Sequence, residues 1–277
     1  MKTIFAANVR FPLVANNRES CLMLLFEVVD MQGLANEVPE LCASPPPRRP
    51  RRTHRKLHGY FVAFALIFAT LVLTGFSRTF LIPIARGKLF KPPIVHVHGA
   101  LFFAWTFLLV TQAVLAATKR LRAHRTIGSI GGWLVLPMLA LGTIVSARDT
   151  VNDFRSGDSE ALSFFYGELA DLAIFGLLAG AAMLLRKKPE HHKRLVLLGS
   201  LGLLGAAMGR IHEIDGWQQS VFFALVASVV GYDIASRRNL HWATVVGAAV
   251  LLGISLTEEW IGKTAMWLST AHHLLKV

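Results

Sequence analysis

The chain has 277 residues, of which 53% are hydrophobic and only 17% are charged, and its formal net charge is +12. Soluble domains hold charged residues near a quarter of the chain, so this composition is typical of an integral membrane protein. The Lys and Arg residues gather in short segments between apolar runs, where membrane proteins carry their positive charge. We therefore expect anionic lipid headgroups as partners and exclude nucleic acid.

The first 57 residues end in a basic, Pro-rich segment, PPPRRPRRTHRK. Such a composition cannot pack a core, so we predict a disordered N-terminal tail over residues 1–57. Both cysteines, Cys21 and Cys42, lie in this tail. A disulfide framework, a Cys-ligated zinc site and an iron–sulfur cluster are therefore excluded from the rest of the chain.

Seven apolar runs follow the tail. About 20 apolar residues cross a hydrocarbon core of roughly 30 Å. The runs are Tyr60–Phe76, Val97–Ala117, Ile127–Ala147, Leu162–Leu185, Leu195–Ile211, Ser220–Ala235 and Trp242–Leu256. We predict an all-α, polytopic membrane bundle of about seven transmembrane helices over residues 58–257. Residues 258–277 carry Trp260 and Trp267 seven apart, which predicts an interfacial amphipathic helix.

Alternate loops of this bundle are strongly basic. TKRLRAHR joins runs two and three, and RKKPEHHKR joins runs four and five, whereas the loop RDTVNDFRSGDSE on the other side is more acidic. By the positive-inside rule, the N-terminus and the basic loops are predicted to be cytoplasmic.

The fifth run, LVLLGSLGLLGAAMGRIHE, is rich in glycine. Its glycines lie three or four residues apart, at Gly199, Gly202, Gly205 and Gly209. In lipid, a face of small residues lets helices approach closely. We therefore predict that this helix is central in the bundle.

Polar residues inside the apolar runs indicate a polar cluster. His98, Trp105 and Gln112 are spaced by seven and share one face of the second helix, which should be turned toward the protein interior. The predicted outer cluster contains Trp105, Gln112, Glu168, Asp171 and Arg210. It is interpreted either as an Asp/Glu–Arg clamp between helices four and five, or as a metal, heme or proton site.

Histidines near both ends of the runs suggest cofactor sites. His98 with His212 outside, and His124 with His192 inside, form two candidate bis-histidine pairs for heme b, because imidazole is a good axial ligand. A separate hypothesis is an outer metal site of His96, His98 and His212. The inner histidines are more simply explained as ordinary residues at the headgroup surface.

Several motifs resemble a known family. GFSRTFLIP, HVHGALFFAW, LRAHRTIG and HHKRLVLL are similar to a widespread family of uncharacterised bacterial multi-pass inner-membrane proteins, over about residues 58–277. The resemblance implies the bacterial inner (plasma) membrane but no established activity. It singles out His98, Trp105, Gln112, His124, Asp171, His192, Lys193, Arg194 and Arg210. A looser similarity to heme-handling four-helix membrane proteins implies heme.

Three functions remain open. The leading hypothesis is a non-catalytic integral membrane protein whose outer polar cluster holds the bundle together or binds a small ligand or lipid headgroup. The second is a heme- or quinone-linked redox protein. The third is a proton-coupled transporter, suggested by Glu168 and Asp171 within a span, although no inverted repeat is evident. No P-loop, GxGxxG before a helix or GxSxG motif indicates an enzyme class, so enzymatic activity stays undecided.

Overall fold

The computed structural model describes residues 53–88, 91–237 and 239–277, and the chain divides into two units, Met1–Pro50 and Arg51–Val277. The predicted tail, with Cys21 and Cys42, therefore lies outside the described residues, except that residues 53–57 belong to the first helix. Every secondary-structure element in the described part of the chain is helical. The all-α fold class is confirmed.

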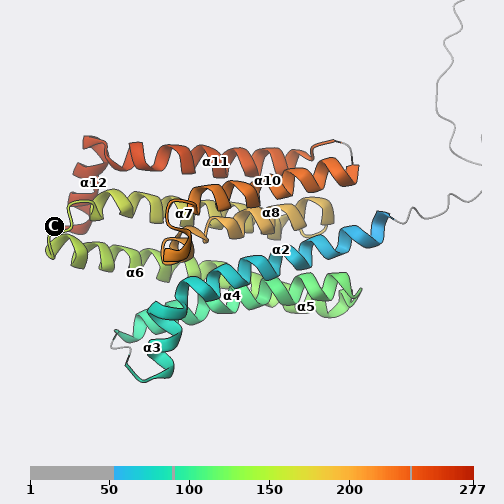
Figure 1. Ribbon diagram of the computed structural model, residues 1–277, viewed down its shortest axis with the longest axis horizontal. Coiled ribbons are helices and arrows are strands. Elements are labelled where there is room, and N and C mark those ends of the chain that lie inside the picture. Colours follow the sequence, from blue (N-terminus) through green and yellow to red (C-terminus); the bar gives the residue numbers. More distant parts are fainter. Residues whose placement is uncertain (1–52, 89–90, 238) are drawn as a thin grey trace, which may run out of the picture. The chain divides into compact units, whose positions relative to one another are not determined.

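The helices follow one another along the chain as Figure 1 shows. They are α2 (Thr53–Phe76), the π-helical η1 (Ser77–Leu81), α3 (Ile82–Ala85), α4 (Pro93–Ala117), α5 (Leu121–Gly131), the 3-10 helix η2 (Gly132–Leu134), α6 (Val135–Arg155), α7 (Ala161–Leu184), α8 (Pro189–Leu201), α9 (Gly205–Met208), the 3-10 helix η3 (His212–Ile214), α10 (Gln218–Arg237), α11 (Trp242–Gly262) and α12 (Ala265–Leu275).

Six helical segments are long and apolar enough to cross a membrane. They are Gly59–Ala85, Pro93–Ala117, Leu121–Arg155, Ala161–Leu184, Gln218–Ser236 and Trp242–Gly262. Large apolar side chains such as Trp133, Leu177 and Leu184 are exposed on them, and apolar exposure on this scale suits a lipid-facing surface. The chain is an integral, multi-pass membrane protein.

The fifth predicted run differs from the expectation of one continuous helix. α8 ends at Leu201, Gly202–Leu204 form a turn with i→i+3 backbone hydrogen bonds, and α9 is a single short turn of helix. At 1.5 Å per residue, α8 is about 20 Å long, which is too short to cross the hydrocarbon core alone.

The chain nevertheless passes from one end of the bundle to the other along α8 and α9. At the start of α8, His192 lies beside His124, close to the α4–α5 corner. After α9, Glu213 binds Arg78, which follows α2. The end of the bundle at His124 and His192 holds the α4–α5 corner at 118–120 and the α7–α8 corner at 185–188. We call it the basic end, because both corners are rich in Lys and Arg. We call the end at Arg78 and Glu213 the opposite end.

The broken helix packs closely on its neighbours at glycine positions. A Cβ on Gly75 of α2 would collide with the backbone oxygen of Ala207. A Cβ on Gly205 would lie 2.9 Å from Asp171 Oδ2, and one on Gly202 would lie 3.1 Å from the Asp171 carbonyl oxygen. The predicted small-residue face therefore does bring this segment against its neighbours, and α8 contacts α7, α10 and α11.

α7 is the helix around which the others pack. It contacts α6, α8, α11 and α12, and Figure 1 shows α6, α7 and α11 running alongside one another. α4 packs on α2, α5 and α6. The main core lies between α2, α8, α10 and α11, where Phe68, Leu198 and Leu251 are almost fully buried.

The C-terminal segment docks on α7. α11 continues to Gly262, so residues 258–262 of the predicted interfacial segment belong to that helix. Thr264 caps α12 by accepting a hydrogen bond from the Trp267 backbone amide. The Trp267 indole N–H donates to the Leu162 carbonyl oxygen at 2.7 Å, which ties α12 to the start of α7.

Candidate functional site

Trp105 lies in the middle of the bundle. Its side chain is 4% exposed, and its indole N–H donates to Ser200 Oγ at 3.2 Å. Its ring meets Phe175 of α7 edge to face, with ring centres 5.0 Å apart. Trp105 therefore joins α4 to α7 and α8, with its polar atom satisfied.

A buried ion pair holds α8 to α10 at the basic end. Arg194 and Asp233 are both 0% exposed, and the guanidinium donates two hydrogen bonds to Asp233 Oδ1. The second carboxylate oxygen accepts from the Thr244 hydroxyl at 2.5 Å and from the His241 backbone N–H at 3.0 Å. Burial acts to lower the pKa of Arg194, but its hydrogen bonds to Asp233 and Glu190 outweigh burial and raise it. Both charges are thus fully compensated.

Further polar contacts surround this ion pair. Lys193 pairs with Glu190 at 2.8 Å and contacts the Tyr232 hydroxyl at 3.3 Å. Tyr232 stacks on Tyr60 of α2 with ring centres 4.7 Å apart, and the Tyr60 hydroxyl bonds Ser228 at 3.0 Å. The network thus extends from α8 and α10 to α2 and stabilises helix packing.

His124 and His192 come together at the same end. Their ring centres are 6.4 Å apart and their planes are nearly perpendicular, at 85°. The Nδ1 of His192 donates to the Ala182 carbonyl oxygen at 2.8 Å, and the Nδ1 of His124 lies 3.2 Å from the Gln112 carbonyl oxygen. Burial lowers the pKa of His192, which favours the neutral form of its ring.

The Gln112 side chain positions His124. When its amide is oriented to satisfy its hydrogen bonds, the nitrogen donates to the His124 carbonyl oxygen at 2.9 Å and the oxygen accepts from the Gly128 N–H at 3.1 Å. The amide nitrogen then also lies 2.7 Å from His124 Nδ1. Gln112 therefore belongs to the basic end and binds the first turns of α5.

The other predicted histidines have different neighbours. The His98 ring stacks on Phe102, with ring centres 4.3 Å apart, and its Nδ1 is buried without a hydrogen bond within the described residues. His212 is exposed and lies 3.4 Å from Asp215, while His96 packs near Phe80. In the described residues, no group of three His, Cys, Asp or Glu side chains could hold a metal ion.

A group of carboxylates lies along α7 toward the opposite end. Glu168 accepts a hydrogen bond from the Ser146 hydroxyl of α6. Asp171 lies against the turn between α8 and α9, at Gly205, and feels the charges of Glu168 and Glu258. Asp171 and Glu258 are half-buried and Glu168 is exposed. Among the described residues, no cationic side chain lies within ion-pair distance of Asp171.

Arg210 does not clamp Asp171. Its guanidinium lies 4.8 Å from the centre of the Phe76 ring and donates to the Ala206 carbonyl oxygen. The acidic residues that act on its charge are Glu168 and Asp149. The five residues of the predicted outer cluster are thus divided: Gln112 lies at the basic end, Trp105 in the middle, and Glu168, Asp171 and Arg210 beyond it.

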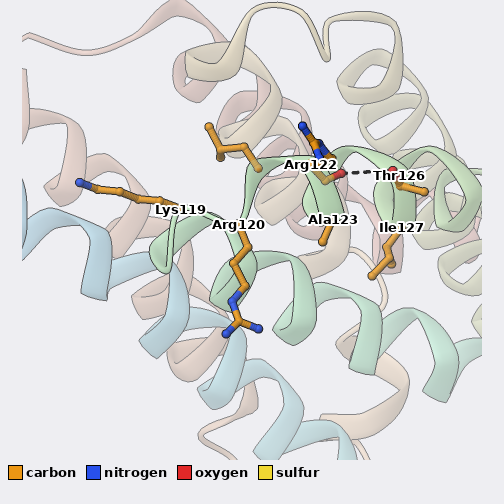
Figure 2. Close-up of a pocket in the computed structure, with 7 residues that line it drawn as sticks. Lys119, Arg120, Arg122, Ala123, Thr126 and Ile127 are labelled. Atoms are coloured by element: carbon orange, nitrogen blue, oxygen red, sulfur yellow. Dashed lines mark hydrogen bonds between the residues drawn. The ribbon is translucent and has the colours of Figure 1, made fainter.

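A shallow, open pocket lies at the α4–α5 corner. It is lined by Lys119, Arg120, Leu121, Arg122, Ala123, Thr126 and Ile127. Figure 2 shows the side chains of Lys119 and Arg120 pointing away from each other, and the Thr126 hydroxyl bonded to the Arg122 carbonyl oxygen. The side chains do not converge on one point, so contact with lipid headgroups at this corner stays a prediction.

Sequence reasoning missed the partners of the charged residues. Asp233, Thr244, Glu190 and Glu258 were not singled out, although each has a defined place in one of the two polar regions. The usable signal was Asp233, a lone carboxylate in the otherwise apolar run six, because such a group needs a partner in the membrane.

Comparison of the chain with protein-family models, with curated proteins and with solved structures finds no match.

Proposed function

We propose that this membrane protein carries a small cation, in the simplest case a proton, and that Asp171 is the group that binds it. The observation that supports this proposal is the position of Asp171 in a candidate span without a cationic partner among the described residues. It lies ten residues into α7, about 15 Å along the helix. An ionised carboxylate at such a depth is unfavourable unless it is paired or hydrated, so it gains from taking up a proton or cation.

The broken helix beside Asp171 supports the same proposal. Non-helical backbone at membrane depth is tolerated where it lines a cavity or is buried in protein, and membrane carriers use such breaks to bind ions. The turn at Gly202–Leu204 and the following Gly205 lie directly against Asp171. Glu168, one turn before Asp171 on the same helix, is exposed.

The structural alternative is weaker for these residues. The predicted clamp requires Arg210 paired with Asp171 or Glu168. Arg210 feels the charge of Glu168, but in the described residues it lies within ion-pair distance of neither carboxylate. The role of holding helices together fits Arg194 and Asp233 better, because both are buried and bonded to each other.

Proton flux into liposomes tests the proposal. The protein is reconstituted with a pH-sensitive dye inside, and flux is driven by a potassium gradient with valinomycin. We expect flux above that of protein-free liposomes, and at least a tenfold reduction, equivalent to about 1.4 kcal/mol, for Asp171→Asn. This substitution keeps the shape of the side chain and removes the titrating group.

Glu259→Gln is the matched control. Glu259 is an exposed acid on α11 that pairs with Lys263 at 2.8 Å, so its replacement should leave the flux unchanged. Equal flux through wild type and Asp171→Asn, or a wild-type flux no greater than that of empty liposomes, contradicts the proposal.

Location and orientation are also proposals. From the resemblance of its motifs, we place the chain in a bacterial inner membrane, and from its loop charges we place the basic end in the cytoplasm. The redox alternative keeps one specific support, the meeting of His124 and His192 at the basic end. The predicted outer heme pair lacks such support, because His98 contacts Phe102 and His212 contacts Asp215.

A further inference from the structure

The Gln112 amide can satisfy its contacts with α5 in one orientation. Its nitrogen donates to the His124 carbonyl oxygen at 2.9 Å, and its oxygen accepts from the Gly128 N–H at 3.1 Å. A carbonyl oxygen only accepts and a backbone N–H only donates, so these two contacts fix the amide. Its nitrogen also lies 2.7 Å from His124 Nδ1. Nδ1 therefore accepts a hydrogen bond, and the neutral His124 ring carries its proton on Nε2.

Protonation of His124 is incompatible with this arrangement. An imidazolium ring carries N–H groups at both nitrogens, so Nδ1–H would face the amide N–H of Gln112 at 2.7 Å. Turning the amide over would place its nitrogen against the Gly128 N–H and its oxygen against the His124 carbonyl oxygen. The protonated ring can donate to the Gln112 backbone oxygen, 3.2 Å from Nδ1, but the side-chain amide must then leave its position on α5.

The bonds from Gln112 matter because α5 has few other buried contacts. Within α5 the one buried residue is Gly131, and Ile127 and Ile130 are exposed. A Cβ on Gly128 would lie 3.1 Å from the Gln112 amide, so the amide rests against bare backbone and has no room to shift toward α5. Segments with few buried contacts open locally at a low cost in free energy. Loss of the amide therefore loosens α5 from α4.

His192 at the neighbouring corner has the opposite hydrogen-bond role. Its Nδ1 lies 2.8 Å from the Ala182 carbonyl oxygen, which can only accept, so Nδ1 is the donor. A protonated His192 keeps this bond, because Nδ1 carries a hydrogen in both charge states. The α7–α8 corner is therefore insensitive to protonation of its histidine, whereas the α4–α5 corner is not.

The charged groups around His124 do not compensate for the lost bonds. α4 and η2, on which α5 packs, contain no acidic residue. On α8, His192 faces His124, and Glu190 is paired with Lys193 and Arg194. The charged residues of the corner itself are exposed cations: Lys119, Arg120, Arg122 and Arg125. Among the described residues, a protonated His124 thus gains no carboxylate partner.

We propose that the α4–α5 corner is an acid-sensitive latch, in which protonation of His124 displaces the Gln112 amide and loosens α5 from α4. Histidine is the side chain that changes charge between about pH 5 and 8, so the latch responds to moderate acidification at the basic end. It does not rest on the proposed cation carrier at Asp171.

Hydrogen exchange of the full-length protein in detergent tests the latch. Exchange of peptides that cover α5 is followed by mass spectrometry at about pH 7.5 and about pH 5.5, after correction for the slower chemical exchange in acid. The protection of α5 should fall about tenfold on acidification, because each lost hydrogen bond changes such an equilibrium by a few-fold to about tenfold. Peptides that cover α8 should keep their protection.

Three variants identify the titrating group. His124→Asn keeps a side-chain oxygen that can accept from the Gln112 amide but does not titrate, so the protection of α5 should be equal at both pH values. Gln112→Glu places a carboxylate that accepts from the protonated ring, so protection should rise in acid instead of falling. His192→Asn is the matched control. Its amide can still donate to the Ala182 oxygen, and it should show the same fall in α5 as wild type.

The outcomes separate the latch from the carrier. Equal protection of α5 at both pH values in wild type, a fall that persists in His124→Asn, or a fall that disappears in His192→Asn overturns the latch. If His124→Asn loses its helical signal, the sign of the change in Gln112→Glu decides, and a fall there also overturns the proposal. An unchanged fall in Asp171→Asn, alongside altered proton flux, shows that the two devices are independent.

Discussion

The bundle has two polar regions, one at the basic end and one toward the opposite end, and they differ in whether their buried charges are paired. At the basic end, Arg194 and Asp233 are completely buried, and every oxygen of the carboxylate has a donor. Toward the opposite end, Asp171 is half-buried beside other acids, and in the described part of the chain no cation pairs with it.

The difference indicates different roles for the same type of side chain. Satisfied buried charges fix the arrangement of helices, and removal of one partner is strongly destabilising. A carboxylate without a partner contributes no such attraction and is retained in spite of its cost, which is typical of functional groups within membranes. We therefore expect Asp233 to matter for stability and Asp171 for function.

The largest effect is expected at Asp233. Replacing Asp233 by Ala leaves the Arg194 guanidinium buried without its main partner, which costs about 3–5 kcal/mol in comparable cases. The free energy of unfolding in detergent, followed by helical signal during titration with SDS, should fall by this amount. The Thr244 hydroxyl and the His241 N–H also lose their acceptor, which adds to the loss.

An exposed ion pair provides the reference for this measurement. Glu259 and Lys263 are separated by one turn of α11 at 2.8 Å, but both are largely exposed. Exposed pairs contribute little because water and salt screen them, so Glu259→Ala should unfold like wild type. If Asp233→Ala also unfolds like wild type, the buried network does not hold the helices together.

A smaller change in the free energy of unfolding, opposite in sign, is expected for Asp171→Asn. Asp171→Asn removes an acid that faces Glu168 and Glu258, so it relieves repulsion and leaves the shape of the side chain unchanged. We expect the free energy of unfolding to stay constant or to rise by about 1 kcal/mol. The same Asp→Asn substitution at Asp233 should lower it, and both are measured in the same SDS titration.

Loss of stability in Asp171→Asn would change the comparison. It would mean that Asp171 holds a structural hydrogen bond or cation that the fold needs, and any loss of proton flux in this variant would then reflect altered packing. Equal stability with lost flux keeps the two regions distinct.

The fold could be predicted largely from the pattern of apolar residues. Runs such as Val97–Ala117 and Leu162–Leu185 lie within α4 and α7 to within a few residues, because length and hydropathy decide which segments cross lipid. The fifth run was harder, since its composition is equally apolar. The segment that breaks packs closely on Asp171 at Gly202 and Gly205, and such tertiary packing leaves no mark in hydropathy.

The candidate sites were predictable only as residue types. Spacing by seven placed Trp105 and Gln112 on one face, but their partners, Ser200 and His124, come from other helices. The pairing of Arg194 with Asp233 joins residues 39 apart in sequence. Residue periodicity is a property of a single helix. It therefore predicts which face of α4 points inward, but not which side chains of other helices contact that face.

The smallest effect is expected from the exposed ion pair that joins the ends of two segments at the opposite end. Arg78 and Glu213 lie 2.5 Å apart, and both side chains are more than half exposed. The backbone N–H of Glu213 and the Arg78 guanidinium lower the pKa of the Glu213 carboxylate. A lowered folded-state pKa means that the pair stabilises the fold above the ordinary glutamate pKa, and that this contribution disappears as the pH falls through the lower, folded-state value.

Comparing wild type with Arg78→Gln should reveal this dependence. The difference between their Tm values should be small at pH 7, shrink as the pH falls below about 4.3, the ordinary glutamate pKa, and shrink again in high salt, which screens exposed charges. A difference that grows on acidification, or that is insensitive to both pH and salt, would show that Arg78 acts through packing beside α2 instead of through charge. In that case even this exposed contact would resemble the buried network of Arg194 more than an ordinary surface pair.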